Sequence, residues 1–378
     1  MKKIPQRAQE NKALSEKEFS EGKGRLECLP QVLITFATDS CNLRCAGCNF
    51  GTATGRKITI SRQGYQRVFD MFRYLDYVMI TGAEMFFDVG NHEHYVERIF
   101  TEGLRHPHLR FVGVTNGTLM TQERAQMIAD KFEKIGISVD SPDPDVYKTI
   151  RIGSKLPLVA GNIKNISSLK SRRGLGRADR PVIYLNFIII ERTYRDLPGM
   201  VQFARDVGAQ VITLQVPLEN SYIDENIFTD EKKTGEYIEL RREASRKAGE
   251  RGIRIQDRTR NTIMKNMPQF KDRLEFTENV AMDRWPNCCR LPWEELYINE
   301  SGDVTVCCTS RTVVGNINEQ SIADIWNSAE MQALRKRIIK GNYSRDCMIN
   351  CCRGYVLPGY YKRNHIRSIL TNVFTNHK

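Results

Sequence analysis

Six short apolar segments, separated by amphipathic ones, constrain the fold of this chain most strongly. Each apolar segment has the length of a β-strand, and the stretches between them place apolar residues at helical spacing. Near-continuous apolar strands that alternate with helices are typical of a parallel sheet covered by helices. The predicted strands are residues 32–38, 77–82, 110–117, 134–140, 182–190 and 211–216, and the predicted helices lie around 61–75, 91–105, 121–131, 156–172 and 194–208.

The alternation alone leaves two arrangements open, a partial barrel and a doubly wound sheet. In both, ligands collect at the carboxyl ends of the strands. Polar residues follow the predicted strands, as in TDSC (38–41), TGAE (81–84) and TNGT (115–118). We therefore expect the functional site at this edge of the sheet.

Three cysteines, Cys41, Cys45 and Cys48, lie directly after the first predicted strand. The chain shows no signal-peptide pattern, and clustered thiols in a reducing compartment indicate metal or redox chemistry and not disulfides. Three thiolates do not complete a tetrahedral zinc site, for which His92 or His94 would be the nearest fourth ligand. A four-iron cluster held by three cysteines instead leaves one iron open to bind another molecule.

The 378 residues carry a formal net charge of +12. This charge fits either a solvated basic surface or attraction to an anionic partner, such as a phosphorylated metabolite, an acidic peptide leader or a nucleic acid. An RNA-recognition signature and a helix-turn-helix pattern are both missing, so nucleic-acid binding is a minor hypothesis. No apolar run approaches the roughly 18 residues of a membrane span, and we expect a cytoplasmic protein.

The spacing Cys41-x3-Cys45-x2-Cys48 resembles the signature of the radical S-adenosylmethionine (SAM) superfamily. The resemblance implies an α/β fold, a partial (β/α)6 TIM-like barrel, with a [4Fe–4S] cluster on these cysteines and SAM on the open fourth iron. Electron transfer from the cluster then cleaves SAM, and the 5′-deoxyadenosyl radical abstracts a hydrogen atom from the substrate. The protein supplies binding and orientation, while the radical chemistry belongs to the cofactor.

The resemblance extends to residues that would contact SAM. Gly82 and Glu84 match the family's Gly-Gly-Glu-Pro-like motif, which meets the SAM amino group, whereas Ala83 and Met85 depart from it. The other expected contacts are Ser138 and Asp140 of a ribose-contacting Ser-x-Asp pattern, Arg151 for the SAM carboxylate, Asn116 at a strand end, and Gln215 on the adenine side.

One position departs from the family in the cysteine motif itself. Gly47 precedes the third cysteine, where an aromatic residue is usual. Its backbone can still meet the adenine, but aromatic packing must come from elsewhere, for which Phe50 is the candidate.

A second group of cysteines begins near residue 288, and by itself it fits either a structural zinc ribbon or another cluster. The segment 296–307 predicts a β-hairpin, and Ser321 predicts the N-cap of the next helix. The spacing Cys289-x12-Gly302-x4-Cys307 resembles the opening of the SPASM and twitch extensions of radical SAM enzymes. Only Cys347, Cys351 and Cys352 follow, so the resemblance implies one auxiliary [4Fe–4S] cluster on Cys289, Cys307, Cys347 and Cys351, with Cys288, Cys308 and Cys352 as neighbours or alternates.

These assignments give an expected domain organisation. A partial barrel comes first, and a small C-terminal α+β, cysteine-rich, SPASM/twitch-like domain follows it. The expected boundaries are an N-terminal arm at 1–30, the barrel at 31–224, a helix and linker at 225–283, the cysteine-rich domain at 284–355 and a basic tail at 356–378.

Family members with such extensions oxidise sugars and aminocyclitols, or crosslink and epimerise residues of ribosomally made peptides. The peptide class often carries an N-terminal leader-binding module, for which the expected arm of about 30 residues is too short. We therefore expect a radical SAM oxidoreductase that dehydrogenates a carbohydrate- or aminocyclitol-type small molecule. Its electron would come from an external one-electron donor such as flavodoxin or ferredoxin.

Two alternatives stay open. A peptide maturase could use Cys28 or a spare cysteine as a hydrogen-atom donor, although a buried small residue is the simpler explanation of Cys28. A zinc- or cluster-containing nucleic-acid-binding regulator is the alternative from another class, and it predicts zinc and no SAM cleavage.

Overall fold

The computed structural model describes residues 6–48, 58–87, 95–176, 179–217, 223–274, 289–308, 310 and 312–342. The chain divides into two compact units. Unit 1 comprises Met1–Lys2, Ile34–Thr59 and Asp76–Glu278, and unit 2 comprises Lys3–Leu33, Ile60–Leu75 and Asn279–Lys378.

Unit 1 is built on a sheet whose strands follow one another in chain order from β1 to β7. Strands β2 to β7 all pair in parallel, and for β2 to β6 the near-continuous apolar segments predict this. The α/β partial-barrel class expected from the sequence is confirmed. The strands are β1 (Val32–Thr38), β2 (Tyr77–Gly82), β3 (Arg110–Thr115), β4 (Phe132–Ser138), β5 (Val182–Ile188), β6 (Val211–Gln215) and β7 (Arg254–Asp257).

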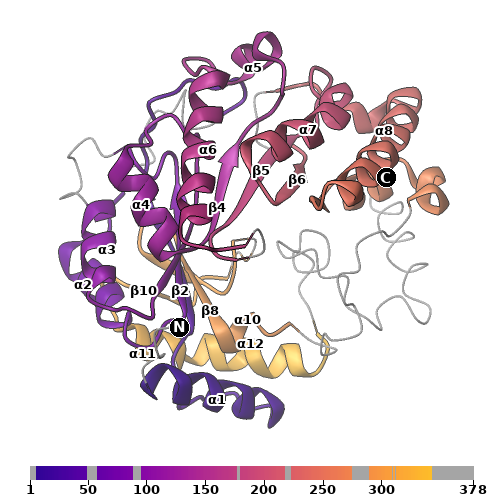
Figure 1. Ribbon diagram of the computed structural model, residues 1–378. Helices are drawn as coiled ribbons and strands as arrows, with labels where there is room; N and C mark the ends of the chain where they lie inside the picture. Colours follow the sequence, from indigo (N-terminus) through magenta and orange to yellow (C-terminus); the bar gives the residue numbers. More distant parts are fainter. Residues whose placement is uncertain are drawn as a thin grey trace. The chain divides into compact units, whose positions relative to one another are not determined.

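Helices cover one face of this sheet. The helices α4, α6, α7 and α8 pack side by side in that order, and α4, α7 and α8 contact β4, β6 and β7 (Figure 1). The helical elements of unit 1 are α3 (Tyr95–Leu104), α4 (Gln122–Lys131), α5 (Pro144–Ile150), α6 (Leu156–Arg172), η1 (Tyr194–Asp196), α7 (Leu197–Val207), η2 (Ile227–Thr229), α8 (Glu231–Glu250), α9 (Arg260–Asn266) and η3 (Pro268–Arg273).

The two faces of the sheet differ in burial, as β5 illustrates. Ile183, Leu185 and Phe187 are fully buried, whereas Tyr184 and Asn186, which point to the other face, are partly exposed. Side chains alternate between faces along a strand, so the apolar residues form the core beneath the helices. The second face is free to carry polar groups for a ligand.

The stretch expected to be a helix and a linker contains more structure than predicted. The expected helix is α8, but the following residues form β7, which pairs in parallel with β6. In β7 only Ile255 is apolar, and an exposed edge strand of four residues needs little hydrophobic patterning. The sheet of unit 1 therefore extends one strand beyond the six that the sequence indicates.

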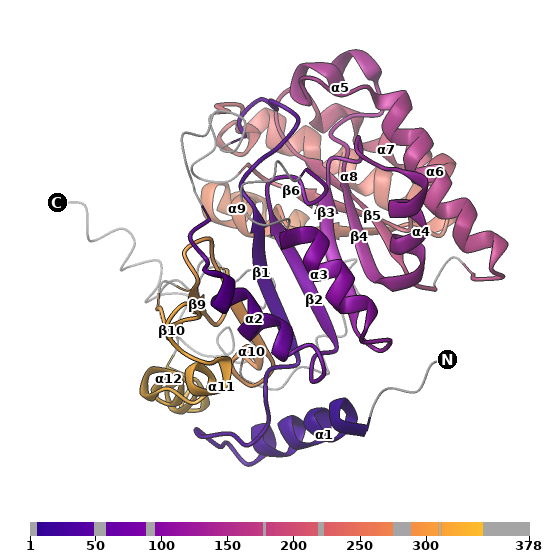
Figure 2. The same ribbon diagram turned by 90° about the vertical axis from the view of Figure 1, so that its left-hand side faces the viewer.

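Unit 2 contains the predicted hairpin. Strands β8 and β9 are antiparallel, and β10 pairs with β9 (Figure 2). Ser321 caps α11 as expected, and a second serine, Ser328, caps the following helix α12. The elements are α1 (Gln6–Ser20), α2 (Arg62–Asp70), α10 (Leu291–Glu294), β8 (Glu295–Ile298), β9 (Asp303–Thr305), β10 (Gly315–Asn316), α11 (Ile322–Trp326) and α12 (Ala329–Ile339).

The expected polar N-terminal arm is also folded, because α1 buries polar side chains that bond to backbone groups. Ser15 donates to the carbonyl of Trp293, and Glu18 accepts from the amides of Glu27 and Cys28. Such bonds satisfy buried polar groups without an apolar stripe. Among the described residues, no helix is both long and apolar enough to cross a bilayer.

Candidate active site at the cysteine loop

Cys41, Cys45 and Cys48 lie on one loop after β1, and all three are partly buried. Two backbone hydrogen bonds fix this loop against the end of α5. The amide of Ala46 donates to the carbonyl of Ile150 at 2.8 Å, and the amide of Arg44 donates to the carbonyl of Ile152 at 3.1 Å. The residue between these two acceptors is Arg151, which the sequence assigns to the site.

The loop sulfurs receive hydrogen bonds from nitrogen donors. Cys41 Sγ accepts from the Leu43 amide at 3.4 Å and from Asn116 Nδ2 at 3.7 Å. Cys45 Sγ accepts from Arg151 Nη1 at 3.8 Å. Donors and a cation around sulfur stabilise the thiolate form, which is the form that ligates metals.

Burial acts in the opposite direction. It raises the pKa of the Cys41 thiol, and it also raises the pKa of Cys45, where the Arg151 charge offsets part of the effect. The irons of a cluster would add positive charge at the loop, and this charge favours the thiolate form.

Gly82, at the end of β2, has a φ of +122°, which residues with a side chain rarely adopt. A Cβ atom there would lie 2.2 Å from the carbonyl oxygen of Thr38. The next two amides, of Ala83 and Glu84, bond to the carbonyls of Thr38 and Ser40 at 2.9 and 3.1 Å. The end of β2 is thereby joined to the residues that lead into the cysteine loop.

Glu84 is 1% exposed and uses its carboxylate within the protein. It accepts from the Thr115 hydroxyl at 2.7 Å and from the Asn116 amide at 2.6 Å. Burial raises the pKa of Glu84, and these two donors partly offset that shift. The side chain thus ties β2 to the end of β3, and a contact between Glu84 and the SAM amino group stays a prediction.

Asn116 lies between Glu84 and the cysteine loop. Its amide nitrogen also donates to Asn42 Oδ1 at 2.9 Å, and its oxygen accepts from the amide and hydroxyl of Thr118. The Asn42 amide in turn donates to the Thr118 hydroxyl at 2.9 Å. Sequence reasoning missed Asn42 and Thr118, whose only signal is their position next to Cys41 and Asn116.

Asp140 and Arg151 form a pair beside Cys45. The Asp140 carboxylate, 1% exposed, accepts from Arg151 Nε and from the Ile188 amide. Burial alone would lower the pKa of Arg151, but the charges of Asp140 and Cys45 raise it, so the guanidinium stays charged. The structure thus brings together three residues that the sequence assigns to the cluster and to SAM.

Ser138, at the end of β4, pairs in register with Asn186 of β5, and Gln215, at the end of β6, pairs with Ile188 two residues further along β5. Gln215 donates its amide to Asn186 Oδ1 at 2.8 Å. The sequence analysis did not select Asn186, although its signal is visible: it is the polar residue in the otherwise apolar run YLNFIII. Ser138, Asn186 and Gln215 give this end of the sheet a row of hydrogen-bonding groups.

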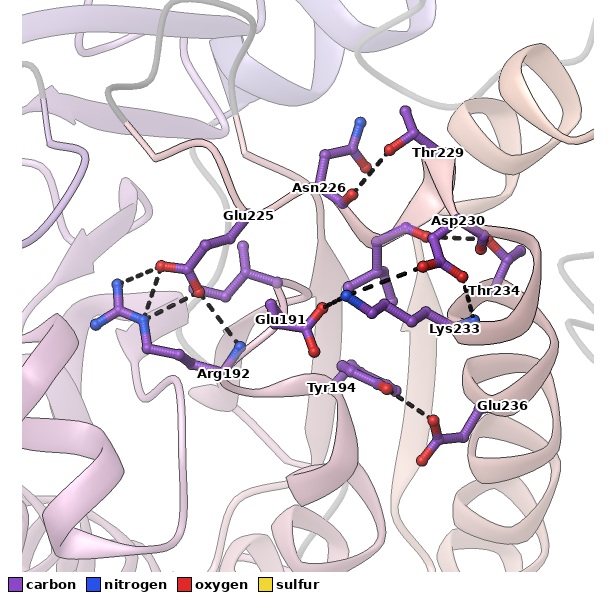
Figure 3. A network of polar contacts seen from close by, with 12 residues as sticks. Glu191, Arg192, Tyr194, Glu225, Asn226, Thr229, Asp230, Lys233, Thr234 and Glu236 are labelled. Carbon is purple, nitrogen blue, oxygen red and sulfur yellow. Dashed lines mark hydrogen bonds and ion pairs between the residues drawn. The ribbon is translucent and has the colours of Figure 1, made fainter.

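A polar network on the β5 side also reaches α5. Arg192 forms an ion pair with Glu225 and donates to the carbonyl and hydroxyl of Thr149, two residues before Arg151. Figure 3 shows this pair beside Glu191, which bonds to Lys233 at the start of α8. The loop after β5, residue 225 and the end of α5 are therefore held together next to the cysteine loop.

In unit 2 the structure describes three of the expected auxiliary-cluster cysteines and neighbours. Cys289 is partly buried, Cys307 is buried and Cys308 is exposed. The burial favours Cys307 over Cys308 as the ligand of that pair. Phe50, His92, His94, Cys288, Cys347, Cys351, Cys352 and the basic tail lie outside the described residues.

Cys28 is 1% exposed, as expected for a structural cysteine, and burial raises the pKa of its thiol to about 12. We predict that Cys28 resists iodoacetamide at pH 8 in the folded protein, because the thiolate is the reactive form. Exposed Cys308 is the internal comparison. Mass spectrometry should find Cys28 labelled only after unfolding; labelling of native Cys28 as fast as Cys308 would contradict its burial.

Family models identify two parts of the chain. Residues 35–204 match the model of the radical SAM superfamily. Residues 288–353 match SPASM, an iron–sulfur cluster-binding domain. The chain is a radical SAM protein with a C-terminal SPASM domain. A radical SAM domain binds a [4Fe–4S] cluster and SAM, and the SPASM domain indicates an auxiliary iron–sulfur cluster, as the sequence predicts.

Curated relatives match only part of this radical SAM protein. Probable GTP 3′,8-cyclases of Methanococcus maripaludis strains C7 and C5 are 23% and 22% identical over 132 residues. Each match covers 32% of this chain and 40% of the relative, so the chain spans less than half the length of these proteins.

Solved structures of similar fold cover more of the chain. Streptococcus suis SuiB bound to S-adenosylmethionine has a TM-score of 0.58 at 15% identity, covering 86% of this chain and 72% of SuiB. SuiB bound to the precursor peptide SuiA has a TM-score of 0.57 at 14% identity, covering 86% of this chain and 71% of SuiB. The anSMEcpe structure with bound AdoMet has a TM-score of 0.53 at 14% identity, covering 83% of this chain and 84% of anSMEcpe. At these identities the likeness establishes the fold alone.

The residues of the cysteine loop fit a radical SAM cluster. Three thiols on one loop match a four-iron cluster that keeps one iron for SAM, and two of the sulfurs already accept N–H bonds. Among the described residues, no three histidine, cysteine, aspartate or glutamate side chains form a group that could hold a single metal ion. A four-iron cluster spreads its ligands over different irons, so convergence on one point is not required.

Proposed function

We propose that the chain is a radical SAM oxidoreductase that dehydrogenates a hydroxyl-rich, carbohydrate- or aminocyclitol-type small molecule. When bound, the cluster and SAM supply a 5′-deoxyadenosyl radical that takes a hydrogen atom from the substrate. The observation that carries the proposal is the placement of the cysteine loop. It bonds to Asn116 after β3 and to Arg151 after α5, and the residues that lead into it bond to Ala83 and Glu84 after β2.

The chain's own residues hold and orient the reactants in this proposal. Cys41, Cys45 and Cys48 would ligate the cluster, and Arg151 would stay charged beside it because Asp140 raises its pKa. Asn116 and Glu84 would keep the loop in place through their bonds to Cys41 and to β3. An external one-electron donor, such as flavodoxin or ferredoxin, would reduce the cluster.

The open face of the sheet supports a hydroxyl-rich substrate. Tyr184, Asn186 and Gln215 place a hydroxyl and two amide groups on this face, and such groups pair with substrate hydroxyls. A site built from hydrogen-bonding side chains rejects molecules that leave them unpaired. The name of the curated relatives, which refers to a nucleotide, also favours a small molecule.

A second candidate is the modification of a ribosomally made peptide. It is favoured by the solved structures of similar fold, since SuiB has been seen with its precursor peptide and anSMEcpe with a peptide. Cys28 is a poor hydrogen-atom donor for it, because the thiol is buried and bonded within unit 2.

Deuterium transfer tests the two candidates directly. The reconstituted, reduced protein would be incubated with SAM and pools of deuterated sugars, aminocyclitols or ribosomal precursor peptides, and the 5′-deoxyadenosine analysed by mass spectrometry. The proposal expects deuterium in the nucleoside from a sugar or aminocyclitol. Deuterium from a peptide alone would reject the small-molecule substrate in favour of the second candidate.

A further inference from the structure

The open face of β7 is strongly basic. Asp257 points toward the helices, because its carboxylate pairs with Arg241 of α8. Side chains alternate along a strand, so Arg254 and Gln256 lie on the opposite face. Arg258 continues the alternation, since its amide still bonds to β6. Arg254, Gln256 and Arg258 are all exposed.

The two arginines are available to bind an anion. Within the described part of the chain, neither guanidinium has a hydrogen-bond or ion-pair partner. An arginine held without a carboxylate partner presents its full fork of donors to an anion. The paired arginines nearby in the sequence are Arg192 with Glu225, Arg195 with Glu236 and Arg241 with Asp257.

Tyr184 of β5 lies on the same face as these arginines. The register aligns Tyr184 with Val211 of β6, and Val211 with Arg254 of β7. The tyrosine ring lies over Gly136 of β4, where a Cβ atom would come within 2.5 Å of it. Burial raises the pKa of Tyr184 against the opposing effect of the Arg258 charge, so the hydroxyl stays a donor.

This basic face is continuous with the candidate active site. Asn186 and Gln215 occupy the same face of β5 and β6, next to Tyr184 and Arg258 along the sheet. At the end of β5, the Ile188 amide bonds to Asp140, the partner of Arg151. A molecule lying on this face could therefore reach from β7 to the residues beside the cysteine loop.

We propose that Arg254 and Arg258 bind the phosphate groups of the substrate. This inference rests on the proposed function and specifies it: the hydroxyl-rich small molecule is phosphorylated or linked to a nucleoside diphosphate. A phosphate has enough oxygens and charge for two guanidinium groups, whereas a carboxylate offers two oxygens and one charge. The position of Gln256 between the arginines adds a neutral donor.

Equilibrium binding tests the phosphate site. Inorganic pyrophosphate and a nucleoside diphosphate would be titrated calorimetrically into the reconstituted protein, at an ionic strength fixed with chloride. In the Arg254→Gln/Arg258→Gln variant we expect the dissociation constants to rise at least about tenfold, because charge-assisted bonds are lost. The control Lys164→Gln/Arg172→Gln removes two exposed charges from α6 and should stay within about twofold of wild type.

Three results would overturn the proposal: pyrophosphate binding that is equal in wild type and the β7 variant, an equal loss in the α6 control, or preferential binding of a hexaglutamate peptide that the β7 variant loses. The last result would assign the face to an acidic peptide. SAM cleavage without substrate is measured on the same samples and should be unchanged in both variants. A wild type that cannot cleave SAM would contradict the proposed function, separately from the binding result.

Discussion

Gly82→Ala is expected to abolish 5′-deoxyadenosine formation and to lower the stability of the protein by about 3 kcal/mol or more. The new Cβ would lie 2.2 Å from the Thr38 carbonyl, so backbone must move, and the φ of +122° is strained for alanine. The movement would break the bonds that join Ala83 and Glu84 to the residues before Cys41. Urea unfolding and iron content after reconstitution measure the two effects.

Gly174→Ala is the matched control for this variant. Gly174 also has a positive φ, +68°, but a Cβ atom there meets nothing within 4 Å. Its cost is therefore the backbone strain alone, about 1 kcal/mol, with iron content and SAM cleavage unchanged. Equal effects of the two substitutions would show that the contact with Thr38 is not what holds the cysteine loop.

Arg151→Met is expected to destabilise the protein by roughly 2–4 kcal/mol, below the range for fully buried pairs because the arginine side chain is 21% exposed. The substitution removes the hydrogen bonds from Arg151 to Asp140 and to Cys45. Of the two donors to the buried Asp140 carboxylate, the Ile188 amide remains. We expect a lower urea midpoint and reduced iron retention.

A second substitution separates charge from packing at this pair. Arg151→Met/Asp140→Leu removes both charges and should be more stable than Arg151→Met alone, since no carboxylate is then buried without its cation. Lys148→Met, which breaks an exposed ion pair with Asp145 on the same helix, should leave the midpoint and iron content unchanged. If Lys148→Met matched Arg151→Met, the pairing of Asp140 with Arg151 would not be the cause.

The sequence predicted the parts of the fold whose residues are strongly patterned. Strands of a parallel sheet covered by helices read as near-continuous apolar runs, so the six strands and the helices between them were visible. The edge strand β7 was not visible, because it lacks an apolar run. Arg254 and Gln256 are exposed, and Asp257 forms an ion pair. Helix α1 was missed for a related reason: Ser15 and Glu18 are buried through bonds to backbone groups, those of Trp293 and Cys28, and not through apolar packing.

The candidate site could likewise be predicted only where its residues form a local pattern. The cysteine motif is a local pattern and could be recognised by its spacing, together with Gly82, Asp140 and Arg151. What the spacing could not give is the tertiary partner of each residue. Glu84 illustrates this, since the sequence offers it as an acceptor for a ligand, whereas in the structure its carboxylate binds Thr115 and Asn116.

The most direct test of the account is a count of iron and sulfide per chain, with a simultaneous assay for 5′-deoxyadenosine. Wild type would be compared with Cys41→Ala/Cys45→Ala/Cys48→Ala after anaerobic reconstitution and reduction with dithionite. With one radical SAM cluster and one auxiliary cluster, we predict about eight irons falling to about four, and no nucleoside from the variant. A variant that kept all its iron, or still cleaved SAM, would contradict the assignment of these cysteines.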